Sequence, residues 1–99
     1  MYRERAHMFP KGVEGFKELL AAAEEWNKLA AEKGWAQGTL FAPTVGGLEL
    51  VAEFDYPDLA TYQRESEEQM MEPRAMALME RFSPFEPRSE LLNTLPSFV

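Results

Sequence analysis

The sequence predicts an α+β domain in which four strands form one antiparallel sheet and two helices cover one face of it. The chain has 99 residues, which is enough for one hydrophobic core. Apolar residues recur every second position in some segments, which indicates strands, and about every 3.6 positions in others, which indicates helices. The predicted order is strand, helix, strand, strand, helix, strand, which is the ferredoxin-like βαββαβ arrangement. We therefore treat residues 1–99 as a single domain.

The first third of the chain predicts a strand and a long helix. Alternation around Ala6 and Met8 indicates a strand over residues 2–9. Over residues 13–33, apolar side chains recur every three or four positions and charged side chains occupy the other face, which is typical of an amphipathic helix. Gly34 is expected to be its left-handed C-terminal cap.

Two further strands are expected to form an antiparallel hairpin. One candidate covers residues 35–42, and the other covers residues 48–55, where apolar and acidic residues alternate. Gly46 and Gly47 lie between them, and a glycine pair is typical of a hairpin turn.

A second helix and a last strand follow. Pro57 is expected at the first position of the helix, with Asp58 near the positive end of the helix dipole. The helix carries an acidic run, formed by Glu65, Glu67, Glu68 and Glu72. We expect this run to be a solvated face, and we expect Pro73 to kink or interrupt the helix. The last strand, from residue 85 to about residue 92, should lie at a sheet edge because Pro87 has no N–H to donate.

Composition and motifs exclude several classes of function. The 10 Lys and Arg against 17 Asp and Glu give a net charge of −7, which disfavours nucleic acid and anionic membranes as partners. The chain has no Cys and one His, so thiol chemistry and multi-histidine metal sites within one chain are not expected. The sequence has no nucleotide-binding motif and no membrane-spanning run, so we expect no cofactor, no secretory signal and a cytoplasmic location.

The sheet face that lacks helices is expected to be a protein interface. That face would carry apolar residues that need cover from water, namely Phe9, Trp35, Phe41 and Val51. A chain of this length has no segment left to form another layer. A second copy of the chain is the economical cover, so the sequence predicts a homodimer through the open sheet face.

Polar side chains on the same face are the candidate functional residues. His7 is the candidate general acid or base, Arg5 would stabilise developing negative charge, and Glu53 would be the accompanying carboxylate. The expected contacts to an anionic or carbonyl-bearing ligand are Trp35, Gln37, Thr39 and Arg88. In the simpler alternative, Arg5 and Glu53 pair across neighbouring strands only to satisfy a buried interface, and Trp35 is a core aromatic.

The segment from Leu50 to Tyr62, LVAEFDYPDLATY, is an apolar strand that turns through an acidic-Pro corner into a helix. With the element order, it resembles the dimeric alpha/beta barrel superfamily, and within it small NIPSNAP-like and antibiotic-biosynthesis-monooxygenase-like proteins. The resemblance implies a dimer with a site between the sheet and the helices of each subunit. Members include cofactor-free oxygenases, isomerases, haem-degrading enzymes and proteins of no known activity. The asparagine, tryptophan and histidine set of the haem-degrading members has no match here.

Two functions remain open from the sequence. In the first, a homodimeric barrel protein binds a small organic molecule and is a cofactor-independent oxygenase or isomerase. In the second, the protein is a non-catalytic assembly or ligand-sensing module, and its polar sheet residues serve only the dimer interface. The two differ in whether His7, Arg5 and Glu53 line an enclosed pocket or are consumed by pairing.

Overall fold

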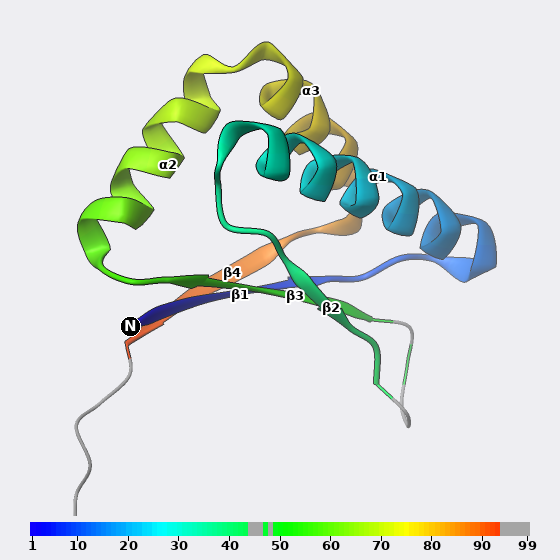
Figure 1. The fold of residues 1–99 in the computed structure, drawn as a ribbon. Coiled ribbons are helices and arrows are strands. Elements are labelled where there is room, and N and C mark those ends of the chain that lie inside the picture. Colours follow the sequence, from blue (N-terminus) through cyan, green and yellow to red (C-terminus); the bar gives the residue numbers. More distant parts are fainter. Residues whose placement is uncertain (44–46, 48, 94–99) are drawn as a thin grey trace, which may run out of the picture.

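A computed structural model describes residues 1–43, 47 and 49–93 of the chain. Its elements are β1 (Tyr2–Met8), α1 (Gly12–Lys33), β2 (Thr39–Phe41), β3 (Leu50–Tyr56), α2 (Leu59–Met71), α3 (Pro73–Phe82), the short 3₁₀ turn η1 (Ser83–Phe85) and β4 (Arg88–Asn93). All three α-helices lie on one side of the sheet (Figure 1), which confirms the predicted ferredoxin-like α+β fold. Within the described ranges, none of these helices has the length and apolar character required to cross a membrane.

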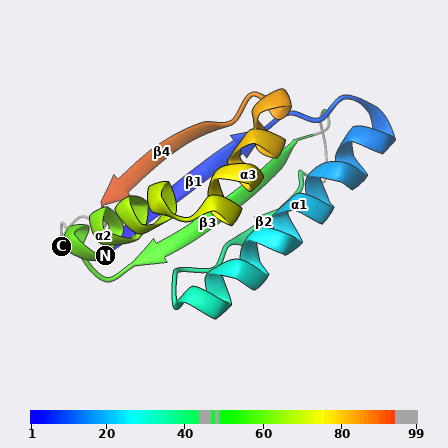
Figure 2. The same ribbon diagram turned by 90° about the horizontal axis from the view of Figure 1, so that it is seen from above.

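The four strands form one antiparallel sheet in the order β2-β3-β1-β4. Strand β1 is central, and its Ala6 lies opposite Ala52 of β3 on one side and Ser89 of β4 on the other. The predicted hairpin is present as the β2–β3 pair, and β4 is at an edge as expected. Seen from above, α1 runs along the β2 side of the sheet and α3 crosses its middle (Figure 2). The predicted Gly46 turn and Leu48 lie outside the described residues.

The strand expected over residues 35–42 is shorter than predicted and begins only at Thr39. Trp35 lies before the strand and is 5% exposed, packed against helical residues on the covered side of the sheet. The reason is the cap of α1. Gly34 has a φ of 73°, which reverses the chain, and the N–H of Trp35 then donates to the carbonyl of Ala30 at 2.9 Å. The large indole is thereby buried against α1, so its predicted place on the open face is wrong.

The start of the second helix and its break at proline both differ in detail from the sequence prediction. Asp58 is the N-cap of α2 and accepts a hydrogen bond from the Thr61 N–H at 2.7 Å, so Pro57 precedes the helix instead of beginning it. Pro73 is the first residue of a separate helix, α3, where its missing N–H carries no penalty. The expected interruption is therefore a clean break into two helices.

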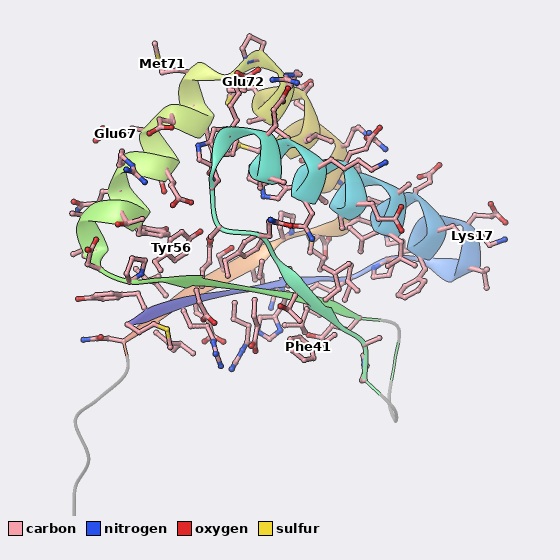
Figure 3. The ribbon with its side chains drawn as sticks, in the orientation of Figure 1. Lys17, Phe41, Tyr56, Glu67, Met71 and Glu72 are labelled. Atoms are coloured by element: carbon pink, nitrogen blue, oxygen red, sulfur yellow. The ribbon has the colours of Figure 1, made fainter. Side chains whose placement is uncertain are left out.

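The acidic run of α2 is only partly the solvated face that the sequence predicts. Glu65 is 4% exposed and accepts the Ala36 N–H at 2.7 Å, while Glu68 accepts the indole N–H of Trp35 at 3.1 Å. Glu67 does point away from the sheet into solvent (Figure 3). The segment after α1 presents N–H donors to α2, and donors removed from water need acceptors. That requirement buries Glu65 and draws the otherwise exposed Glu68 toward the indole of Trp35.

Glu72 joins α1 to α3 at the corner between the last two helices. Its carboxylate lies 3.1 Å from Nζ of Lys33, at the end of α1, and 3.1 Å from Nε of Arg74. Hydrogen bonds from Lys33, and next from Arg74, lower the pKa of Glu72 to about 2. Glu72 is therefore a structural link between helices and not a free acidic side chain.

The core consists of two clusters under the helices. The first joins α1 to the central strands and contains Met8, Leu19, Ala23, Leu50, Ala52 and Phe85. The second joins α1 to α3 and contains Leu29, Ala30, Trp35, Ala75 and Leu78. Phe82 packs against both clusters, and Trp26 packs against the second. These two aromatic side chains also border the cavity described next.

Candidate functional site

The two faces of the sheet separate two groups of polar side chains. Because side chains alternate along β1, Glu4, Ala6 and Met8 face the helices, whereas Arg5 and His7 project from the opposite, open face. Figure 3 shows charged side chains below the sheet together with Phe41, and shows Tyr56 on the side of the helices. The predicted catalytic residues and the interior of the fold are therefore on opposite sides of the sheet.

The open face carries a network of cross-strand ion pairs. Nε of Arg5 donates to Glu53 at 2.9 Å, and a second guanidinium nitrogen of Arg5 lies 3.7 Å from Glu90. Nε of Arg3 donates to Asp55 at 2.7 Å. The register explains the pairing, because Arg5 lies directly opposite both Glu53 and Glu90. The structure thus brings Arg5 and Glu53 together as the sequence predicts, and the two side chains form an ion pair with each other.

His7 continues this network at the next open-face position of β1. Its Nδ1 lies 2.7 Å from Glu49 and its Nε2 lies 3.3 Å from Glu90. The hydrogen bond with Glu49, and next the one with Glu90, raises the pKa of His7 above its ordinary value. Both ring nitrogens have carboxylate partners, and only the protonated ring donates from both. The surroundings of His7 therefore favour a charged ring that takes part in the ion-pair network over a neutral ring that acts as a base.

The stability of the protein is expected to depend on pH through His7. A folded-state pKa raised above the ordinary 6.5 means that the stabilising contribution is complete below that pH and is lost as pH rises through the folded-state pKa. The wild type should therefore exceed His7→Gln in free energy of unfolding by more at about pH 5 than at about pH 9, by up to about 1 kcal/mol for a partly exposed pair. Urea unfolding over this pH range measures the difference, and a gap that is independent of pH contradicts it.

Two of the expected ligand contacts lie at the margins of the network. Thr39 is exposed on β2, opposite Glu53. Arg88 begins β4 opposite His7, and its guanidinium lies 5.5 Å from the ring centroid of Phe9, within the range of a cation–π contact.

The other two expected contacts lie outside the sheet. Gln37 is exposed in the segment that joins α1 to β2. Trp35 is buried on the covered side, so the sheet separates it from Arg5 and Glu53. The structure therefore does not bring the full predicted set into one site.

A cavity of about 250 Å³ lies between the sheet and the helices. Its floor is a row of small side chains, because Ala6 of β1 stands between Ala52 of β3 and Ser89 of β4 in the sheet register. No large side chain rises from this row, and the space above it stays open. The larger apolar residues that line the cavity are Met8, Trp26, Leu40, Phe54, Met79 and Phe82.

Glu4 carries the one carboxylate among the residues that line this cavity. The hydroxyl of Tyr56 donates to it at 3.2 Å. Burial raises the pKa of Glu4, and the hydrogen bond from Tyr56 offsets part of that increase. Burial, and next the charge of Glu4, raises the pKa of Tyr56, so its hydroxyl remains a donor. A carboxylate with a raised pKa in an apolar cavity is suited to exchange protons with a bound molecule.

The sequence contains a signal for this pair in the alternation of two strands. Glu4 alternates with Ala6 and Met8, and Tyr56 continues the buried positions of the third strand. The single histidine favours the open face instead, because histidine is the usual acid or base near neutral pH. A single glutamate near the start of a strand gives no such indication until a tyrosine from another strand is placed against it.

The lining offers little to a metal or haem. Among the residues that border the cavity there is no histidine or cysteine, and Glu4 alone is acidic. Across the described part of the chain, no group of three or more His, Cys, Asp or Glu side chains is arranged to hold a metal ion. Asn27 is engaged by the protein itself, since its amide donates to the Gly38 carbonyl and accepts the Gly38 N–H, both at 2.8 Å.

Comparison with known proteins adds information on the fold. No protein-family model and no curated protein matches the sequence. An uncharacterised NIPSNAP domain protein from Burkholderia xenovorans matches with a TM-score of 0.72 and 18% identity, over 99% of this chain and 96% of that one. A NIPSNAP family protein from Agrobacterium tumefaciens matches with a TM-score of 0.72 and 19% identity, over 98% and 93% of the two chains.

A third solved structure, of an antibiotic biosynthesis monooxygenase, matches with a TM-score of 0.74 and 16% identity, over 97% of this chain and all 100% of that one. Identities this low establish a common fold and leave activity open. The chain therefore has the ferredoxin-like fold of NIPSNAP-like and antibiotic-biosynthesis-monooxygenase-like proteins, which confirms the resemblance seen in the sequence.

Proposed function

We propose that the protein binds a small, mostly apolar organic molecule with a carbonyl or hydroxyl group in the cavity between the sheet and the helices, and that Glu4 exchanges a proton with it. The observation that carries this proposal is the position of the Glu4 carboxylate, inside an apolar cavity and within hydrogen-bond distance of the Tyr56 hydroxyl. Buried apolar pockets with few polar groups are typical of small-molecule sites.

The cavity supports a ligand of one or two rings. Its volume of about 250 Å³ is below the roughly 300–1,000 Å³ that is usual for sites of drug-sized ligands. Trp26, Phe54 and Phe82 border it and favour a planar ring. The expected ligand is neutral and not the anion that Arg5 suggests. The acidic Glu4 faces this cavity, whereas Arg5 is on the other side of the sheet.

The chemistry follows from one carboxylate. The ionised Glu4 takes a proton from a carbon next to the ligand's carbonyl group, and the electron pair of the broken C–H bond moves toward the carbonyl oxygen. Return of the proton to a different atom completes an isomerisation. Reaction of the carbanion with dioxygen begins an oxygenation, an outcome that agrees with the likeness to an antibiotic biosynthesis monooxygenase. Neither branch requires a metal or an organic cofactor.

Binding of 1-naphthol tests the ligand site. The affinity of the wild type is expected to increase about five- to tenfold between about pH 4 and pH 8, because an ionised Glu4 accepts a stronger hydrogen bond from the naphthol hydroxyl than a neutral group does. In Glu4→Gln the affinity should not depend on pH. Isothermal titration calorimetry measures both, with the outward-facing Glu67→Gln as the matched control. Absence of binding to the wild type, or the same pH dependence in Glu4→Gln, contradicts the proposal.

A second function class has its own support on the open face. His7, Arg5 and Glu53 are engaged by charged partners, as expected if they serve an interface and not catalysis. The same face exposes apolar surface, with Phe41 49% and Leu92 39% exposed. We propose that a second copy of the chain covers this face, since a two-fold dimer buries one patch against itself. In a non-catalytic module, these residues would have no role besides assembly.

A further inference from the structure

Gly38 lies against the ring of Phe54, and both residues line the cavity. A Cβ built on Gly38 would lie 2.8 Å from Cζ and 2.9 Å from Cε1 of Phe54, closer than real contacts allow. Among the described glycines, the positive φ values belong to Gly12 and Gly34. Glycine is therefore required at position 38 by the space that the Phe54 ring occupies and not by the backbone conformation.

The backbone at Gly38 is fixed in place. Both its N–H and its carbonyl bond to the side-chain amide of Asn27, each at 2.8 Å, which ties this segment to α1. The next residue, Thr39, begins β2 and is paired with β3. With the backbone held on both sides, a side chain at position 38 would be accommodated by movement of the Phe54 ring. The unfilled space beside that ring is the cavity.

We propose that Gly38 is a specificity-determining residue, which sets the size of the ligand by allowing the Phe54 ring to lie over a bare α-carbon at the cavity wall. This inference rests on the proposed function and deepens it. The simpler account is that an aromatic ring covers a glycine near a sheet edge and stabilises the sheet. The two accounts differ in outcome, because loss of stability weakens all ligands alike, whereas a displaced ring excludes only the larger ones.

A pair of ligands of different size separates these accounts. Isothermal titration calorimetry of Gly38→Ala is expected to show phenol affinity within about threefold of the wild type and 1-naphthol affinity reduced by about tenfold or more. Gly15→Ala is the matched control, because its added methyl group would be 3.7 Å from Phe85, an ordinary contact, at a position that does not border the cavity. Equal weakening of both ligands by Gly38→Ala overturns the proposal.

Two variants of Phe54 extend the test. The double variant Gly38→Ala/Phe54→Leu should recover 1-naphthol binding, because the shorter side chain removes the clash. Phe54→Leu alone should bind the three-ring 9-phenanthrol at least about tenfold more tightly than the wild type, which provides a result even if Gly38→Ala does not fold. Unchanged 9-phenanthrol affinity in Phe54→Leu contradicts a size-limiting ring.

A crystal structure of ligand-free Gly38→Ala keeps this inference separate from the proposed function. The ring of Phe54 is expected to occupy part of the cavity. If the ring keeps its place and β2 moves away instead, the inference is wrong even where naphthol binds the wild type. If the wild type binds neither phenol nor naphthol, the proposed function fails, and the ring position in the variant still decides whether Gly38 controls the free volume.

Discussion

Glu4→Gln is expected to lower the rate of hydrogen exchange in 2-tetralone by roughly 10²- to 10⁴-fold, the usual contribution of a positioned general base. This two-ring ketone has acidic hydrogens next to its carbonyl, and its size suits the cavity. In deuterated water the wild type should exchange these hydrogens faster than buffer does, because Glu4 is held in the cavity by the Tyr56 hydroxyl at 3.2 Å. Proton NMR follows the loss of the signal. Exchange at the buffer rate in the wild type contradicts proton transfer by this protein.

The pH profile identifies the group responsible. Only the ionised carboxylate removes a proton, so the rate should rise with pH through the raised pKa of Glu4. Tyr56→Phe removes the hydrogen bond that holds this pKa down, so its profile should shift to higher pH. Glu67→Gln, on the solvated face of α2, should match the wild type. Identical profiles for Tyr56→Phe and the wild type would mean that Tyr56 does not position the base.

Glu4→Gln is expected to remain folded, because protonation of Glu4 is linked to stability. Glu4 has a folded-state pKa raised above its ordinary 4.5, so its contribution to stability is complete below that pH and is lost as pH rises through the folded-state value. Glutamine keeps an oxygen that accepts from Tyr56 and carries no charge into the cavity. Glu4→Gln should therefore be at least as stable as the wild type near neutral pH, which urea unfolding of both proteins measures.

Arg5→Ala is expected to weaken the proposed dimer by roughly 1–3 kcal/mol, or about five- to 150-fold in dissociation constant. Arg5 pairs with Glu53 at 2.9 Å and with Glu90 at 3.7 Å, on the face that the second copy would cover. Its removal would leave Glu53 with Arg3 alone, at 3.5 Å, and Glu90 with His7 alone, at 3.3 Å, in a desolvated interface. Sedimentation velocity over a range of concentrations measures the shift from dimer to monomer.

A control on the opposite side of the molecule makes the result specific. Arg81 of α3 forms a comparable ion pair with Glu25 of α1, on the helical side of the fold, so Arg81→Ala should leave the dissociation constant unchanged. A wild type that is monomeric at micromolar concentration contradicts the dimer itself. A dimer of Arg5→Ala as tight as that of the wild type would show that the interface lies elsewhere on the surface.

Short-range sequence patterns were sufficient to predict most of the secondary-structure elements. Alternation along β1 and β3, the helical periodicity that ends at Gly34, and the proline at position 73 each predict structure through interactions among near neighbours in sequence. The same alternation placed Arg5, His7 and Glu53 on one face, because strand side chains point to opposite faces in turn. It misplaced Trp35, because the left-handed cap redirects the chain and burial against the helices outweighs strand alternation.

The sequence by itself determined the fold class, the central pairing of Arg5 with Glu53 and the sheet face that has no helix over it. The cavity was decided only by the tertiary structure, because it depends on groups far apart in the chain. Ala6, Ala52 and Ser89 form its floor only in one register, and Glu4 gains its raised pKa only where helices exclude water from the sheet. The candidate base thus depends on burial, which a short-range pattern does not specify.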